Sequence, residues 1–314
     1  RRRNIKPVLA CFFYFYANAH IKIILLHYLL CALLLYSPTA AYGQMDGGCD
    51  KSASAALTEG NKAEQREAEL ARVREMASEI IQERAKHKHT YSRKAKSKNA
   101  NDASGFVVIT DYIPDAVVEL RYFSNYNFVG ARVDAYEEPV AICTREAAEA
   151  LKMVADDLRK KGYLLKIFDS YRPQAAVDHF VRWSKDLRDI KMKDDFYPSF
   201  HDKTTLFPTY IAKHSGHSKG STIDLTIVNA ATLEDVDMGG TFDFFGNRSH
   251  YAFKGVTAQQ AANRKLLHDA MVKHGFNYYS SEWWHFTLKN QPYPKTYFTF
   301  SVSTKHFNPN RSKK

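Results

Sequence analysis

The stretch SGHSKGSTIDLTIV, residues 215–228, joins a glycine-containing loop to a run that alternates apolar and polar residues. Alternation of this kind is typical of a half-buried β-strand whose polar side chains, Asp224 among them, face away from the core. His217 precedes the strand in a segment where Gly216 and Gly220 allow the chain to fold back. The stretch therefore predicts that an imidazole and a carboxylate approach one point at the start of a strand.

A second stretch, SSEWWHF (residues 280–286), places Glu282 three residues before His285. In an ideal strand these two side chains point to opposite faces, so a bend or bulge is needed to bring both to one site. Together with His217 and Asp224, His285 supplies two nitrogens and one oxygen, a set typical of a catalytic zinc ion with an open fourth position. Glu282 then remains as the carboxylate that takes a proton from water. The alternative is that Glu282 and His285 form a structural pair in the interior.

The stretch DSYRPQ (residues 169–174) lies where an apolar strand gives way to a helix that begins at Pro173. Arg172 is therefore expected at the end of a strand. Its guanidinium is predicted either to form an ion pair at the surface or to stabilise an oxyanion on a carbonyl that zinc polarises.

Residues 103–314 have the composition of a globular domain that is long enough to bury a core without disulfides. Helices are expected at 144–162, 173–187 and 257–274, because capping residues or a proline begin each segment. A buried strand is expected at 163–169. Helices and strands alternate without a regular βαβ rhythm, so we predict an α+β fold, a single compact domain with a small mixed or antiparallel sheet flanked by helices. Further strand candidates are VVEL, STIDLTIV and WWHFTL.

The N-terminal third differs from this domain. Residues 1–44 have the layout of a secretory signal, with Lys22, a short apolar core and small residues at 39–41. The core is short for a membrane span, so we expect a cleaved signal, with an uncleaved membrane anchor as the alternative. In either case the protein is expected to be exported to the periplasm or cell envelope. Residues 45–102 are expected to form a charged amphipathic helix followed by a basic linker.

Composition narrows the function classes. The chain of 314 residues carries a formal net charge of +11, and the excess is concentrated in the first hundred residues. We find no nucleic-acid motif and no basic patch interleaved with aromatic residues, so no nucleic-acid partner is expected. Of the four cysteines, only Cys143 lies in the expected domain, which leaves neither a disulfide framework nor a cysteine zinc site.

Several other histidines are not expected to bind metal. His214 lies three residues before His217, but its spacing to the strand carboxylate does not favour it as a ligand. His250, His268 and His274 fall in a loop or on a helix without a paired carboxylate, so they are expected at the surface or in packing.

Four stretches taken together resemble the D-alanyl-D-alanine dipeptidases, zinc enzymes associated with vancomycin resistance: SGHSKGSTIDLT, SSEWWHF, DSYRP and ELRYFSNYNFVG. The wider group includes D-Ala-D-Ala carboxypeptidases, and the likeness runs from about Val107 to the C-terminus. The resemblance implies Glu282 as the catalytic base and Arg172 as the group that stabilises the transition state. It implies one zinc ion per chain, held by His217, Asp224 and His285.

The resemblance also concerns the substrate. Tyr122, in ELRYFSNYNFVG, and Asp243, in MGGTFD, match residues that hold the free ammonium of the dipeptide in the family. Ser215 is expected to contact the substrate as well. The alternative for the first two is structural, with Asp243 capping a turn and Tyr122 packed in the core. The activity implied is hydrolysis of D-Ala-D-Ala to two D-alanines in cell-wall peptide metabolism, with a small D-configured dipeptide as the partner.

Two alternative functions use the same residues. A zinc D,D-carboxypeptidase would trim the terminal D-alanine from a peptidoglycan stem peptide in an open groove. A zinc-containing wall-binding module without catalysis would need neither Glu282 nor Arg172. The match at Asp243 favours the dipeptidase over the carboxypeptidase, and the presence of Glu282 and Arg172 favours an enzyme.

Overall fold

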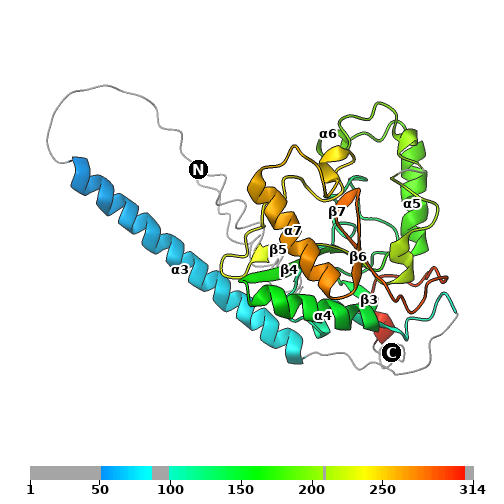
Figure 1. Cartoon of the computed structure of the whole chain (residues 1–314), viewed down its shortest axis with the longest axis horizontal. Helices are drawn as coiled ribbons and strands as arrows, with labels where there is room; N and C mark the ends of the chain where they lie inside the picture. The colour runs from blue at the N-terminus through cyan, green and yellow to red at the C-terminus, as the bar shows by residue number, and fades with distance from the viewer. Residues whose placement is uncertain (1–50, 87–98, 208–209, 308–314) are drawn as a thin grey trace, which may run out of the picture. The chain divides into compact units, whose positions relative to one another are not determined.

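The computed structural model describes residues 51–86, 99–207 and 210–307, which fall into two compact units, Arg1–Glu83 and Arg84–Lys314 (Figure 1). Before residue 99 the structure describes one helix, α3 (Lys51–Lys86), in the segment where a charged helix is expected. The predicted signal segment and most of the predicted basic linker lie outside the described residues. None of the described helices is both long and apolar enough to cross a membrane.

The second unit is built on a mixed five-stranded sheet with the strand order β2-β4-β5-β7-β6. β2 pairs with β4 in parallel, and the other neighbours are antiparallel. A separate antiparallel pair joins β1 to β3. The sheets and helices agree with the predicted α+β class, although β1, β3 and β6 were not among the predicted strands. The strands are β1 (Phe106–Val108), β2 (Val117–Val118), β3 (Ile142–Thr144), β4 (Tyr163–Asp169), β5 (Thr222–Asn229), β6 (Phe276–Tyr279) and β7 (Glu282–Leu288).

Helices α4 (Arg145–Arg159) and α7 (Ala258–Lys273) pack against each other and against the sheet, where α4 contacts β4 and α7 contacts β6 and β7 (Figure 1). The predicted capping box at the start of α7 is present, with reciprocal bonds between Thr257 and Gln260. The remaining helices are α5 (Gln174–Lys185), α6 (Lys193–Phe196) and the 3-10 turns η1 (Ile109–Asp111), η2 (Lys203–Leu206), η3 (Gly216–Lys219), η4 (Asn247–Ser249) and η5 (Thr304–Phe307).

Strand β5 lies at the centre of the sheet, and the prediction that it is half-buried is wrong. Its residues from Thr222 to Val228 are all buried, so both faces are covered. Asp224 and Thr226 are only 1% and 3% exposed. The alternating pattern correctly separates an apolar face from a polar one, but the polar face of β5 points into the protein and not into water.

The start of β7 departs from a regular strand, as the spacing of Glu282 and His285 requires. The pairing of β6 with β7 shifts register between Tyr278 and Tyr279: Tyr278 pairs with Phe286, whereas Tyr279 pairs with Glu282. A bulge of this kind redirects side chains along one strand. It allows Glu282 and His285 to reach the same side of the sheet.

The loop before β5 depends on one glycine. Gly220 has φ +80°, a left-handed conformation that follows η3, and a Cβ at this position would meet the ring of Phe106 at 2.1 Å. Gly216, which was also expected to provide freedom, is not in the left-handed region. The fold-back between His217 and Asp224 therefore needs a glycine at Gly220, both for its backbone angle and for its contact with Phe106.

The contact of Gly220 with Phe106 predicts that alanine substitutions at Gly220 and at Gly162 have unequal effects on stability. Gly162 has a similar angle, φ +83°, but nothing lies within 4 Å of a Cβ there. We expect Gly162→Ala to lower the free energy of unfolding by about 1–2 kcal/mol through backbone strain alone. Gly220→Ala should cost about 1–3 kcal/mol more because of overpacking against Phe106. Urea denaturation of both variants measures the difference, and equal losses would contradict the proposed contact.

Candidate functional site

All eight residues singled out in the sequence line one cleft of the second unit, with a volume of about 260 Å³. They come from loops and strands that are far apart in the sequence. Aromatic and aliphatic side chains, among them Phe128, Phe180 and Phe245, also line this cleft. The eight are Tyr122, Arg172, Ser215, His217, Asp224, Asp243, Glu282 and His285.

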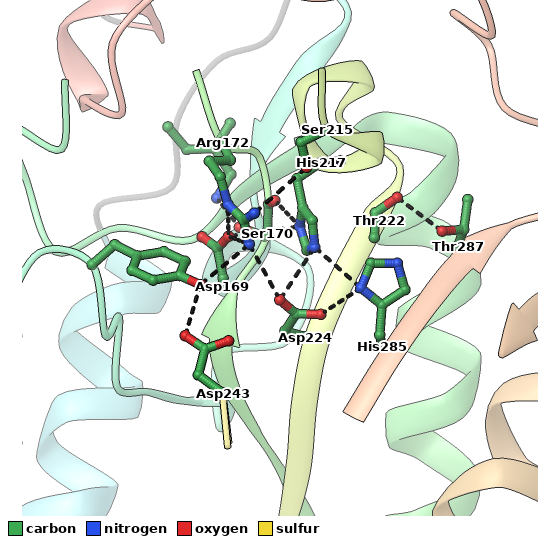
Figure 2. A network of polar contacts seen from close by, with 12 residues as sticks. Asp169, Ser170, Arg172, Ser215, His217, Thr222, Asp224, Asp243, His285 and Thr287 are labelled. Carbon is green, nitrogen blue, oxygen red and sulfur yellow. Dashed lines mark hydrogen bonds and ion pairs between the residues drawn. The ribbon is translucent and has the colours of Figure 1, made fainter. Parts of the chain in front are cut away.

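Sheet register brings two of the three predicted metal ligands together. Asp224 on β5 pairs directly with His285 on β7, and His285 Nδ1 lies 3.0 Å from Asp224 Oδ1. His217 comes from η3, and its Nε2 lies 3.2 Å from Asp224 Oδ2 and 3.3 Å from His285 Nδ1. Figure 2 shows the three side chains converging on one point.

The orientation of His217 is set by a backbone carbonyl. Its Nδ1 lies 2.7 Å from the carbonyl oxygen of Ser170, to which it donates a hydrogen bond (Figure 2). This bond fixes the tautomer and leaves Nε2 with its lone pair toward Asp224 and His285. Metal-binding histidines commonly have such an outer partner on the other ring nitrogen.

The donor atoms fit a divalent metal ion. One atom from each of His217, Asp224 and His285 lies within 4.8 Å of the other two. Asp224 Oδ1 is buried yet receives no well-formed hydrogen bond from the described residues, although His285 Nδ1 is close. A buried carboxylate oxygen without a donor is costly unless a cation satisfies it. Two imidazoles and one carboxylate suit zinc, and they also suit other divalent ions.

The electrostatics of the cluster favour an ionised Asp224. Burial raises the pKa of this carboxyl, but the nearby imidazoles of His217 and His285 outweigh burial and hold the pKa below its usual value. Burial lowers the pKa of His285, whereas Asp224 and Glu282 raise it, and the net shift is upward. The acid and the imidazole therefore stabilise each other's charged forms.

Glu282 lies at the edge of this cluster, on the first residue of β7. Its Oε2 is 3.3 Å from His285 Nδ1, and its side chain is 25% exposed. Burial raises the pKa of its carboxyl, and the charge of Asp224 adds to the rise. A carboxylate with a raised pKa next to a candidate metal site is suited to accept and return a proton.

Arg172 is held by a residue to which the sequence analysis gave no role. Asp169, the last residue of β4, is fully buried and accepts a hydrogen bond from Arg172 Nε at 2.9 Å (Figure 2). It accepts a second one from Tyr136 at 2.6 Å. The Arg172 side chain is 12% exposed and its Nη2 lies 3.5 Å from Asp224 Oδ2. The alternative of a surface ion pair for Arg172 is therefore wrong.

Tyr122 and Asp243 form a direct pair in the cleft. The Tyr122 hydroxyl donates to Asp243 Oδ2 at 2.7 Å. Asp243 has φ +61°, an unusual conformation for a residue other than glycine. Its neighbour Phe242 stacks on Phe168 at 4.9 Å and meets Trp284 at 5.4 Å, which anchors the loop.

The charge of Asp243 differs from the expectation. A carboxylate that is anionic on its own suits an ammonium group, but burial raises the pKa of Asp243 well above its usual value, and the charge of Asp224 adds to this. The carboxyl therefore gains from a cation that enters the cleft. Tyr122 packs in the core at 1% exposure, as the structural alternative expects, while its hydroxyl still reaches the cleft.

Ser215 begins the turn that carries His217. Its hydroxyl accepts a hydrogen bond from the backbone N–H of His217 at 3.2 Å, and it lies 3.5 Å from Arg172 Nη1. The side chain thus caps η3 and also borders the cleft beside the guanidinium.

The other histidines lie outside the cluster. His214 lines the cleft but bonds to Gln174 and not to the candidate ligands. The expectation that His268 and His274 lack carboxylate partners is wrong, because Asp269 and Asp157 lie 3.0 Å and 2.8 Å from them. Neither these histidines nor their partners line the cleft.

Comparison with known proteins identifies relatives of the second unit. Residues 102–303 match the protein family described as D-ala-D-ala dipeptidase. A protein of Enterococcus faecalis named D-alanyl-D-alanine dipeptidase is 40% identical over 200 residues, which cover 64% of this chain and 99% of that protein. Proteins with the same name from Enterococcus faecium and Streptomyces coelicolor are both 37% identical, over 98% and 97% of their lengths and 63% and 61% of this chain.

The donor geometry predicts which histidine substitutions abolish metal binding. We expect the wild-type chain to retain one zinc ion after dialysis. His217→Ala and His285→Ala should weaken zinc binding by more than about a hundredfold, since losing even an outer partner of a ligand costs about 10- to 100-fold. Metal content is measured by atomic emission.

The matched control is His214→Ala, which removes the same side chain from the same cleft, three residues before His217. This variant should keep its zinc. Full zinc content in His217→Ala, or an equal loss in His214→Ala, would contradict the assignment.

Proposed function

The chain belongs to the D-Ala-D-Ala dipeptidase family, and we propose that it hydrolyses the free dipeptide D-Ala-D-Ala to two molecules of D-alanine. The membership confirms the family and the class of enzyme, a peptidase, that the sequence predicted. The observation that carries the specific proposal is the convergence of eight residues, from six separate segments, on one small cleft.

The proposed metal is one zinc ion held by His217, Asp224 and His285. Zinc in such a site polarises the peptide carbonyl and makes water a stronger nucleophile at neutral pH. The burial of Asp224 and the fixed tautomer of His217 support this assignment, since both present lone pairs to one point.

Glu282 is the proposed general base and acid. Its carboxylate accepts a proton from the attacking water and returns that proton to the amine that leaves when the peptide bond breaks. Its position 3.3 Å from His285 and its raised pKa support this role. Neither a wall-binding module nor a structural metal site needs such a group.

Arg172 is the proposed partner of the oxyanion that develops on the carbonyl. Asp169 holds its Nε, and the rings of Tyr122 and Phe180 lie 4.8 Å and 5.3 Å from its Cζ. A guanidinium held in this way needs little reorganisation when charge develops, which is the condition for electrostatic stabilisation of a transition state.

The substrate proposal is a free dipeptide with an N-terminal ammonium. Asp243, with Tyr122 bonded to it, is the proposed ammonium site, because a buried carboxyl with a raised pKa is stabilised by an incoming cation. The cleft of about 260 Å³ is smaller than the range of about 300–1,000 Å³ that drug-sized ligands occupy. This size favours a dipeptide over the extended stem peptide of a carboxypeptidase.

The proposed setting is cell-wall peptide metabolism in the cell envelope, where D-Ala-D-Ala is a component of the wall precursor. This part rests on the signal pattern in residues 1–44 and on the nature of the substrate.

Substitution of Glu282 tests the proposal. We expect Glu282→Gln to lower kcat/KM for D-Ala-D-Ala by about 10²- to 10⁴-fold, the usual contribution of a general acid–base group. Its zinc content should stay at the wild-type level, because Glu282 is not a proposed ligand. D-alanine release measured with D-amino-acid oxidase gives the rate.

Glu234→Gln serves as the matched control, since Glu234 is exposed and does not line the cleft. It should keep wild-type activity. A Glu282→Gln enzyme that hydrolyses D-Ala-D-Ala at the wild-type rate would sink the assignment of the base.

A further inference from the structure

The opposite end of the substrate needs a partner that the proposed mechanism does not supply. D-Ala-D-Ala carries a carboxylate as well as an ammonium, and the ammonium is assigned to Asp243. Of the described residues that line the cleft, the basic ones are Arg172, His214, His217 and His285. Two of these are proposed ligands, and Arg172 is bound to Asp169. His214 is the remaining group.

His214 is held in place by a hydrogen-bond network that determines which of its ring nitrogens donates. Its Nδ1 lies 3.1 Å from Gln174 Oε1, and its ring packs on Tyr297 with centroids 4.8 Å apart. The amide nitrogen of Gln174 donates to Asp178 Oδ1 and to the carbonyl of Lys213, each at 2.9 Å. Because both partners are acceptors, the amide orientation is fixed and Oε1 must face the imidazole. Nδ1 of His214 is therefore the donor.

The second ring nitrogen of His214 is available to a ligand. Within the described residues, Nε2 makes no hydrogen bond, and the side chain is exposed at the cleft. With Nδ1 already donating, a carboxylate at Nε2 requires a proton there as well. The ring that binds a carboxylate is thus the imidazolium, and Gln174 stabilises it by accepting from Nδ1.

A series of contacts separates Asp243 from the turn that carries His214. Asp243 bonds to Tyr122, whose hydroxyl lies 3.5 Å from Arg172 Nη2. Arg172 Nη1 in turn lies 3.5 Å from the hydroxyl of Ser215, the residue that follows His214. Asp243 and the segment that carries His214 thus lie on either side of Tyr122 and Arg172, and both line the cleft. The cleft therefore offers one acidic and one basic group to a dipeptide with an ammonium and a carboxylate.

We propose that His214 is a specificity-determining residue that binds the C-terminal carboxylate of the dipeptide through Nε2. This inference rests on the proposed dipeptidase function and adds the second charged end of the substrate. Because His214 is part of the cleft wall, it would favour substrates whose free carboxylate lies close to the scissile bond.

The test compares two substrates, D-Ala-D-Ala and its C-terminal amide, which lacks the carboxylate charge. In the full chain loaded with zinc, His214→Ala should raise KM for D-Ala-D-Ala about tenfold, the low end of a hydrogen bond to a charged group. The kcat should change less than about twofold, since the interaction does not depend on the transition state. KM for the amide should be the same in wild type and variant.

Two further variants separate charge recognition from a structural effect. His214→Lys should restore part of the affinity for D-Ala-D-Ala and leave KM for the amide unchanged. Lys213→Ala removes a neighbouring positive charge that does not line the cleft, and it should leave both KM values unchanged. Thermal melts and zinc content show whether each variant is folded.

The outcomes are distinct. An unchanged KM in His214→Ala, or an equal rise for both substrates, would overturn the carboxylate assignment while leaving the dipeptidase function in place. A wild-type enzyme that cleaves neither substrate would remove the proposed function, and the role of His214 would fall with it.

Discussion

The site depends on the register of three antiparallel strands. Asp169 on β4 pairs with Asp224 on β5, and Asp224 pairs with His285 on β7, so three polar residues form one row across the sheet. Because side chains alternate between faces, a shift of one residue in either pairing would turn a member of this row to the other side. The Thr222–Thr287 pair, with hydroxyls 2.9 Å apart, lies two residues from the Asp224–His285 pair and supports the same register (Figure 2).

Acidic groups gather in the interior around this row. Asp169, Asp224 and Asp243 are each no more than 9% exposed, and Glu282 borders them. Buried carboxylates are stable only when cations or donors satisfy them. Arg172 balances Asp169, and a divalent ion at Asp224 together with a substrate ammonium at Asp243 would balance most of the rest. The proposed metal ion and the proposed substrate ammonium would therefore be the two cationic groups that balance this site.

Local patterns in the sequence predicted the local features well. The capping box at Thr257, the strand at 163–169 and the helix after Pro173 all appear where short-range rules place them. The spacing of Glu282 and His285 also predicted an irregular strand, and the register shift beside Tyr279 has that effect. These features follow from neighbouring residues, which is why they can be read from one sequence.

Features that depend on distant residues were missed. The burial of both faces of β5 arises from its central place in the sheet, which alternation alone does not reveal. Asp169 and its partner Arg172 both stand inside the quoted DSYRP stretch, so their positions were a usable signal, but Tyr136, 33 residues away, reaches Asp169 only in the fold. The network around His214 likewise joins Gln174 to residues forty positions away.

The most direct test of the account is the release of D-alanine by the zinc-loaded full chain from D-Ala-D-Ala and, in parallel, from a stem pentapeptide that ends in the same pair. We expect rapid release from the dipeptide and little from the pentapeptide, because the proposed ammonium site at Asp243 and the small cleft would require a free N-terminus next to the scissile bond. Faster release from the pentapeptide would contradict it and would make the enzyme a carboxypeptidase with an open groove.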